Sequence, residues 1–117
     1  MARTVLIVDD HPSFRTSVRR VLEAAGYEVI GEAPDGSSAL AAIRTHRPDV
    51  VLLDVQLPDI DGFDVAARVT GHDDAPVVVL TSSRDGSDYG AMIARSGARG
   101  FIAKAELSGP ALEELLT

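Results

Sequence analysis

Five short apolar segments, each followed by a stretch with helical periodicity, organise this 117-residue chain. They cover residues 5–8, 29–30, 50–53, 77–80 and 101–103. Four of the five are almost continuously apolar, which is typical of parallel strands buried on both faces of a sheet. The segment from Tyr27 to Ala33 mixes apolar and polar residues, so we expect an edge strand there.

Helix signals fill the intervals between these segments. The first helix is indicated by apolar residues at positions 14, 18, 21, 22 and 25, with Pro12 near its start and Gly26 just past its end. Asp35, Asp61 and Ser108 are the candidate N-caps of the second, third and fifth helices. Leu107 and Leu112 are spaced for a hydrophobic staple across the last cap.

The fourth helix is expected over about residues 85–96. Tyr89, Met92, Ile93 and Ser96 would line one of its faces, and Gly97 would end it. Gly86 and Gly90 lie inside this span, so we expect the helix to be intrinsically weak.

Strict alternation of five strands and five helices predicts an α/β fold: one parallel sheet with helices on both faces. The doubly wound, flavodoxin-like (βα)5 arrangement has the strand order 2-1-3-4-5 and suits five strands. Its ligand crevice lies at the carboxyl ends of strands 1 and 3. Residues 1–117 fit a single domain of ordinary size.

Composition excludes several classes of function. The chain has no cysteine, which excludes disulfides, thiol chemistry and Cys-ligated zinc. Eleven Lys and Arg against 18 Asp and Glu give a net charge of −7, which argues against DNA binding by this chain itself. The arginines at 15, 19 and 20 fit a solvated helix face. With no apolar run long enough to span a bilayer and no signal-like segment, we expect a cytoplasmic protein without membrane contact.

Polar residues follow the predicted strands where their carboxyl ends meet. Asp9 and Asp10 follow the first strand, Asp54 the third, Thr81 the fourth and Lys104 the fifth. Three clustered carboxylates repel one another unless a cation intervenes, and oxygen ligands of this kind suit Mg²⁺. Lys104 and Thr81 could hold phosphoryl oxygens. The chemistry indicated is phosphoryl transfer to a carboxylate.

Other motifs do not fit. The first strand–helix turn has neither a dinucleotide-binding glycine pattern nor a Walker pattern. Residues 59–64 superficially suggest a calcium loop, but the sixth position is not Gly and the twelfth is Thr70. His11, His46 and His72 lack metal-ligand spacing, and we expect His46 and His72 on the surface at helix ends.

The ordered set of motifs resembles a bacterial two-component response-regulator receiver domain, which is CheY-like. The motifs that carry the resemblance are Val5-Leu6-Ile7-Val8-Asp9-Asp10, Asp54 with Leu57-Pro58 and Asp61-Gly62, Val79-Leu80-Thr81, and Gly100-Phe101-Ile102-Ala103-Lys104. Asp9-Asp10-His11-Pro12 resembles the NarL/LuxR-type subgroup, whose members carry a C-terminal helix-turn-helix. Ala105 stands where many receiver domains have proline, which puts the family's usual cis peptide in doubt.

The resemblance implies a phosphorylation-dependent switch rather than an enzyme. Asp54 would take a phosphoryl group from a histidine kinase. Mg²⁺ would be bound by Asp10, by Asp9, by Asp54 and by the backbone carbonyl of Gln56. Lys104 would hold the phosphoryl group, Thr81 would move towards it, and Phe101 would change rotamer with Thr81.

The partners implied are a histidine kinase, a second copy in a phosphorylation-dependent homodimer, and DNA only through an output domain outside this chain. One alternative is a stand-alone receiver domain acting through protein–protein contacts. Two others are a Mg²⁺-dependent phosphohydrolase and a degenerate receiver domain that only binds partners.

Overall fold

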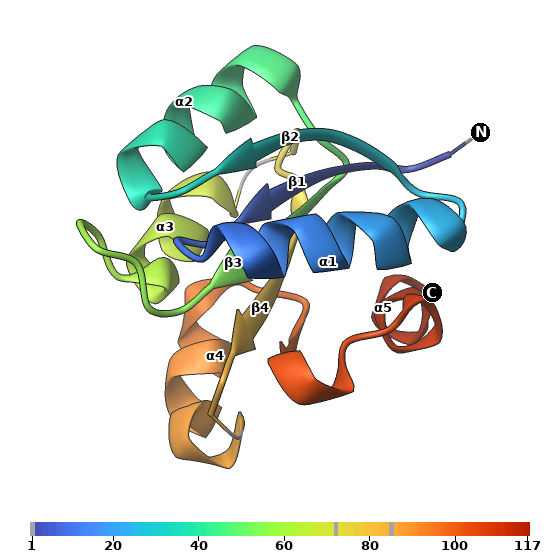
Figure 1. Ribbon diagram of the computed structural model, residues 1–117. Helices are drawn as coiled ribbons and strands as arrows, with labels where there is room; N and C mark the ends of the chain where they lie inside the picture. Colours follow the sequence, from blue (N-terminus) through green and yellow to red (C-terminus); the bar gives the residue numbers. More distant parts are fainter. Residues whose placement is uncertain (1, 72, 85) are drawn as a thin grey trace.

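The computed structural model describes residues 2–71, 73–84 and 86–117, which form a sheet between two helical layers (Figure 1). The described strands are all parallel and lie in the order β2-β1-β3-β4-β5. They are β1 (Thr4–Val8), β2 (Glu28–Ala33), β3 (Val50–Asp54), β4 (Val77–Ser82) and β5 (Gly100–Ala103). The predicted fold class and strand order are confirmed, as is the edge position of β2.

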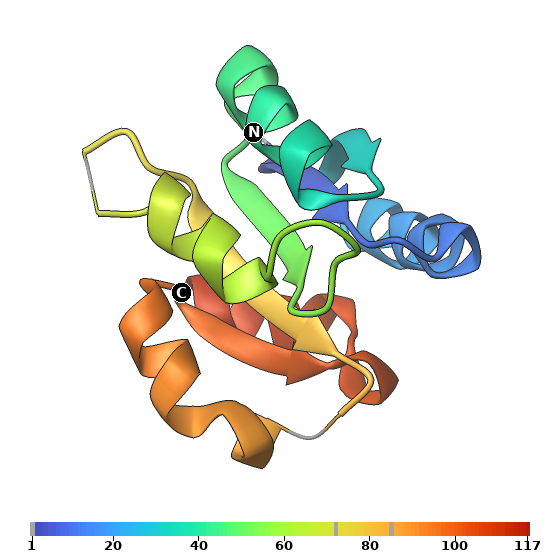
Figure 2. The same ribbon diagram turned by 90° about the vertical axis from the view of Figure 1, so that its left-hand side faces the viewer.

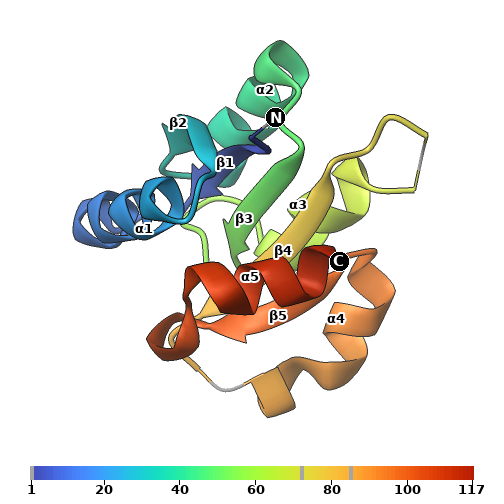
Figure 3. The same ribbon diagram turned by 90° about the vertical axis from the view of Figure 1, so that its right-hand side faces the viewer.

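The helices lie on both faces of the sheet. They are α1 (Pro12–Ala24), α2 (Gly36–His46), α3 (Gly62–Val69), α4 (Gly90–Ser96) and α5 (Gly109–Leu116), with short 3-10 helices η1 (Gly86–Tyr89) and η2 (Lys104–Glu106). Figure 3 shows α1 and α5 on one side of the sheet and α2, α3 and α4 on the other. By length and hydropathy, none of the helices within the described ranges could span a bilayer.

Alternation along the strands divides the core into two clusters, because successive strand residues point to opposite faces. On one face, Val5 and Ile7 pack with Leu22 of α1 and Leu112 of α5. On the other, the core includes Leu6, Val8, Ala39, Ile43, Phe63, Val65 and Leu80. The central strand β3 is buried along its whole length, including its last residue, Asp54. The continuous apolar run that predicted β3 therefore reflects burial on both faces.

The three predicted N-caps are confirmed. Asp35 accepts a hydrogen bond from Ser38 N at 2.8 Å. Asp61 accepts from Phe63 N at 2.7 Å, and Ser108 Oγ accepts from Ala111 N at 3.1 Å. Each cap satisfies a backbone N–H that the helix itself leaves unpaired, typically worth about 1 kcal/mol. Local sequence thus sets where three of the helices begin.

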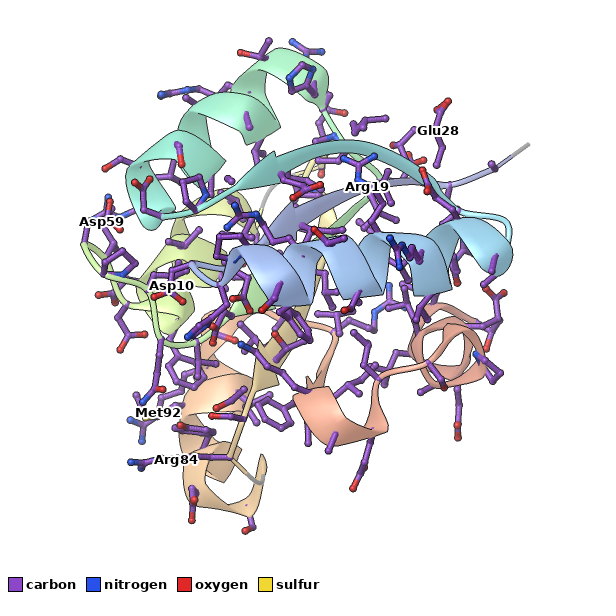
Figure 4. The ribbon with its side chains drawn as sticks, in the orientation of Figure 1. Asp10, Arg19, Glu28, Asp59, Arg84 and Met92 are labelled. Atoms are coloured by element: carbon purple, nitrogen blue, oxygen red, sulfur yellow. The ribbon has the colours of Figure 1, made fainter. Side chains whose placement is uncertain are left out.

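The fourth helix differs from its prediction. The α-helical part begins only at Gly90, after the 3-10 turn η1, and residue 85 lies outside the described residues. Tyr89 therefore belongs to η1, where its ring packs between the rings of Phe63 and Phe101. Met92, predicted to share a helix face with Tyr89, Ile93 and Ser96, is 46% exposed and points outward from α4 (Figure 4). The change from a 3-10 to an α-helical period separates Tyr89 from the predicted helix face, since one helical period cannot describe both segments.

Two further expectations need correction. Val21, predicted on the apolar face of the first helix, is 39% exposed. The buried surface of α1 is narrower than its apolar face and is provided by Val18 and Leu22. Arg15 and Arg19 do not simply face solvent: both contact Glu32 on β2, at 3.0 and 2.8 Å. These ion pairs tie α1 to the edge strand. His46 is exposed at the end of α2 as expected, whereas His72 lies outside the described residues.

Candidate functional site

The polar residues predicted to converge do so at the carboxyl edge of the sheet. Figure 2 shows the tips of β3, β4 and β5 at this edge, beside the loop from β3 to α3. Asp9 and Asp10 follow β1, Asp54 ends β3, and Lys104 follows β5. The parallel sheet brings together residues that are up to 95 positions apart in the chain, from Asp9 to Lys104.

Asp54 is held in a fixed position by two neighbours. Its carboxylate is almost fully buried; Oδ1 accepts a hydrogen bond from Gln56 N at 3.0 Å, and Oδ2 is 3.1 Å from Lys104 Nζ. Burial raises the pKa of Asp54 and the charge of Asp9 adds to the rise, outweighing the lowering effects of the Gln56 N–H and of Lys104. The result is a desolvated carboxylate whose negative charge is only partly compensated.

Asp9 is the most buried carboxylate of the group. It is fully shielded from solvent, and its Oδ2 lies 2.6 Å from Lys104 Nζ. Within the described part of the chain, this oxygen accepts no hydrogen bond of good geometry. The other oxygen, Oδ1, accepts from the backbone N–H of His11 at 2.8 Å. One buried oxygen therefore depends on cationic charge alone for compensation.

Lys104 is the cation at the centre of the site. Its ammonium contacts Asp9 and Asp54, and it also lies 4.5 Å from the centre of the Phe14 ring. Burial by itself would lower the pKa of Lys104, but the neighbouring carboxylates of Asp9 and Asp54 outweigh it and raise the pKa. The side chain is therefore firmly protonated and bridges β1 and β3.

The carboxylates fit a divalent cation. Ligand atoms of Asp9, Asp10, His11 and Asp54 all lie within 4.8 Å of one another. Carboxylate oxygens suit Mg²⁺, and the buried carboxylates of Asp9 and Asp54 share the single ammonium of Lys104, so negative charge in the cluster exceeds what this lysine compensates. Asp10 is exposed, so the cluster is open to solvent on one side.

Comparison with known proteins agrees with this geometry. The model of the family described as "Response regulator receiver domain" matches residues 5–116. The chain belongs to this family.

Relatives of the receiver domain carry names from transcriptional regulation. This chain is 41% identical over 103 residues to a protein of Pseudomonas aeruginosa named "Putative transcriptional regulator". The match covers 87% of this chain and 49% of that protein. The chain is 43% identical over 101 residues to the probable transcriptional regulatory protein NarL of Mycobacterium tuberculosis, covering 86% and 47%. The chain thus spans about half the length of the curated relatives it matches.

Solved structures share the fold over nearly the whole chain. The signal receiver domain of the NarL protein of M. tuberculosis superposes with a TM-score of 0.85 at 37% identity, covering 98% of this chain and 97% of that one. A LuxR-family response regulator from Aurantimonas sp. SI85-9A1 gives a TM-score of 0.88 at 30% identity, covering 99% and 86%. The resemblance drawn from the sequence motifs is confirmed at the level of family and subgroup.

Thr81 and Phe101 lie where the receiver domain motifs predict, although their roles remain predictions. Thr81 is buried and pairs in register with Asp54, and its carbonyl accepts from Val55 N at 2.9 Å. Phe101 packs against Tyr89, with ring centres 6.0 Å apart. Tyr89 Oη is 3.5 Å from Ser82 Oγ, next to Thr81 in the chain. An aromatic contact therefore links β5 to η1, and Tyr89 of η1 also contacts the end of β4 at Ser82.

Several residues in or next to the acidic cluster were not predicted from the sequence. Phe14 lies under Lys104, and Arg15 donates from Nη1 to the backbone carbonyl of Asp9 at 2.5 Å. The sequence predicts both only as residues of a helix face. The sequence gives His11 no metal-ligand spacing, yet this residue belongs to the cluster. Its position directly after two aspartates at a strand end was a usable signal.

Asp59 is a fourth missed residue, and it anchors the loop that follows Asp54. Its carboxylate accepts hydrogen bonds from Gly36 N at 2.7 Å and Ser37 N at 2.9 Å, at the start of α2. These backbone N–H groups hold the pKa of Asp59 well below its usual range. The sequence carries no local signal for this contact, since the partners are 23 and 22 positions away.

The peptide bond between Lys104 and Ala105 is trans, and the structure has no cis peptide bond among the described residues. The departure from proline at Ala105 is therefore accommodated without the family's usual cis geometry.

Proposed function

We propose that this receiver domain is a phosphorylation-dependent switch in which Asp54 accepts a phosphoryl group from a histidine kinase. The observation that carries the proposal is the setting of Asp54: a buried carboxylate at a strand end, 3.1 Å from a protonated lysine and beside two further aspartates. A carboxylate in a structural ion pair needs no such excess of negative charge around it. A carboxylate that accepts a phosphoryl group with the help of a metal ion does need it, because the additional carboxylates hold the metal ion.

The transfer forms one bond and breaks another. An oxygen of Asp54 attacks phosphorus, and the phosphorus–nitrogen bond to the kinase histidine breaks with its electron pair left on the imidazole nitrogen. Asp9, Asp10, Asp54 and the backbone carbonyl of Gln56 would hold Mg²⁺, which supplies positive charge to the transferring oxygens. The Gln56 N–H fixes the direction of the Asp54 carboxylate, so the nucleophile is oriented before the donor arrives.

Lys104 has two tasks in this proposal. Before transfer, its ammonium pairs with both Asp9 and Asp54 and so reduces the cost of burying two carboxylates side by side. After transfer, it can follow the phosphoryl oxygens while keeping its contact with Asp9. Thr81, which lies beside Asp54 in the adjacent strand, would move towards the phosphoryl group and donate its hydroxyl.

The movement of Thr81 would reach the surface through aromatic contacts. Ser82, next to Thr81, lies close to Tyr89, whose ring is packed between Phe63 and Phe101. A change of rotamer at Phe101 would therefore require Tyr89 and η1 to adjust. We propose that this rearrangement favours a homodimer or regulates transcription through a helix-turn-helix output domain outside this chain, as the names of the relatives support.

Intact-mass measurement after incubation with acetyl phosphate and Mg²⁺ tests the proposal. We expect the wild-type chain to gain one phosphoryl group and the Asp54→Asn variant to gain none. Asp64→Asn, which changes an exposed carboxylate in the first turn of α3, is the matched control and should be labelled like the wild type.

The alternatives give different results in the same experiment. A degenerate receiver domain would remain unlabelled under all conditions. In a parallel incubation with a phosphomonoester in place of acetyl phosphate, a phosphohydrolase would release phosphate with many turnovers per chain, whereas the switch should release none. Asp10→Asn should slow labelling, and labelling at the wild-type rate would remove Asp10 from the proposed metal site.

A further inference from the structure

His11 brings an imidazole into a cluster otherwise made of carboxylates. Its Nδ1 lies 3.0 Å from Asp10 Oδ1 and 3.1 Å from Asp9 Oδ1. The residue is anchored at the same place by its backbone, because its N–H also donates to Asp9 Oδ1 at 2.8 Å. In Figure 4, Asp10 lies at the end of the sheet where this cluster forms. The phosphoryl-transfer steps proposed above make no use of the imidazole.

These spacings match adjacent positions in the coordination shell of one ion. Metal–ligand bonds of about 2.1 Å at right angles place neighbouring ligand atoms about 3.0 Å apart. The two nitrogen–oxygen distances at His11, 3.0 and 3.1 Å, agree with this value. The contact between Nδ1 and Asp9 Oδ1 also has the length of a hydrogen bond, so a metal ion would replace the Nδ1 proton there. All four side chains of the cluster, Asp54 included, keep their ligand atoms within 4.8 Å. One ion bound between Asp9 and Asp10 would thus be within reach of the imidazole nitrogen.

Asp9 separates this position from Lys104. Its Oδ2 faces the ammonium, whereas its Oδ1 faces His11. A cation on the His11 side therefore does not need to displace Lys104. The His11 side chain is 66% exposed, so an ion can enter from solvent and the ring can adjust its angle without disturbing the core.

An imidazole ligand changes which ions the site prefers. Carboxylate oxygens suit Mg²⁺, Ca²⁺ and Mn²⁺, whereas imidazole nitrogen suits Zn²⁺, Ni²⁺, Cu²⁺ and iron. We propose that His11 Nδ1 is a metal ligand, so that the cluster binds a divalent transition ion such as Ni²⁺ or Zn²⁺ through nitrogen and oxygen, and Mg²⁺ through oxygen alone. The neutral ring would carry its proton on Nε2 when Nδ1 is bound to metal. This inference rests on the proposed function, because it concerns the ion site beside Asp54.

Titration calorimetry with Ni²⁺ alone and with Mg²⁺ alone tests the proposal on the wild type, His11→Ala and His46→Ala. His46 is an exposed histidine at the end of α2 and controls for binding by any surface imidazole. We expect His11→Ala to weaken Ni²⁺ binding at least about tenfold. Removing a residue that only hydrogen-bonds to a metal ligand already lowers metal affinity by about 10- to 100-fold. Mg²⁺ affinity should change less than twofold, and His46→Ala should change neither.

Two results would overturn the proposal. If His11→Ala binds Ni²⁺ like the wild type, the imidazole is not a ligand. If Mg²⁺ and Ni²⁺ affinities fall together, His11 merely positions the aspartates. Failure of the proposed function is a separate outcome, since it appears as absence of wild-type labelling by acetyl phosphate with Mg²⁺, whichever ion His11 selects.

Discussion

Gly62→Ala probes the closest approach between a helix and the strand that carries Asp54. A Cβ at residue 62 would lie 2.6 Å from Val55 Cα and closer still to the carbonyl oxygen of Asp54. Non-bonded carbon atoms prefer about 3.5–4.0 Å, so the start of α3 would have to move about 1 Å away from β3. Both obstacles are backbone atoms of the buried residues Asp54 and Val55 and cannot rotate away.

The cost should lie at the upper end of the range for overpacking, which is about 1–3 kcal/mol. The first turn of α3 also places Phe63 and Val65 in the core, so a displacement of the helix disturbs packing on that face. We expect a loss of about 3 kcal/mol in the free energy of unfolding, or about 10 °C in Tm for a domain of this size. Labelling of Asp54 should also slow, because its carbonyl shares the contact.

Urea unfolding followed by circular dichroism measures the effect, with Gly90→Ala as the matched control. A Cβ at residue 90, the first residue of α4, would meet nothing within 4 Å. The control should therefore be neutral or stabilised by up to about 1 kcal/mol, since alanine is the better helix former. The scatter of such measurements is about 0.5 kcal/mol. If the free energy of unfolding of Gly62→Ala lies within that margin of the wild-type value, the contact between α3 and β3 is softer than its distances indicate.

Three further predictions concern the site and its coupling. Asp54→Asn should stabilise the metal-free protein at neutral pH. Because the pKa of Asp54 is raised in the folded state, the wild type loses stability as the pH rises through that pKa. In urea titrations, the extra free energy of unfolding of Asp54→Asn should therefore grow with pH above about 4, the pKa of an unperturbed aspartate, and vanish below it. Asp59→Ala should reduce the amide-exchange protection of Gly36 without unwinding α2, which Asp35 still caps; unchanged protection would contradict the anchoring role. Phosphorylation should change amide exchange mainly across residues 81–101 and hardly at residues 5–8. If the exchange rates change mainly in α1 and stay constant across residues 82–96, the coupling through η1 is refuted.

Much of the fold follows from patterns that are local in the chain. Continuous apolar runs predict buried parallel strands because such strands have no solvent-facing side. Asp35, Asp61 and Ser108 predict helix starts because a cap bonds within its own first turn. The convergence of Asp9, Asp54 and Lys104 was also predictable, because strand ends in a parallel sheet meet at one edge whatever the intervening loops contain.

The contacts that depend on packing between distant segments were not predictable in this way. Asp59 bonds to the start of α2 and Lys104 lies over Phe14 only because the sheet and helices have brought these segments together. Likewise, η1 replaces the first turn of the expected helix where Tyr89 packs between Phe63 and Phe101. Local patterns determined the strands, the caps and the acidic edge, because their partners are neighbours or strand ends. Tertiary packing decided which side chains surround that edge, because the contact energy of each depends on residues that the chain places far away.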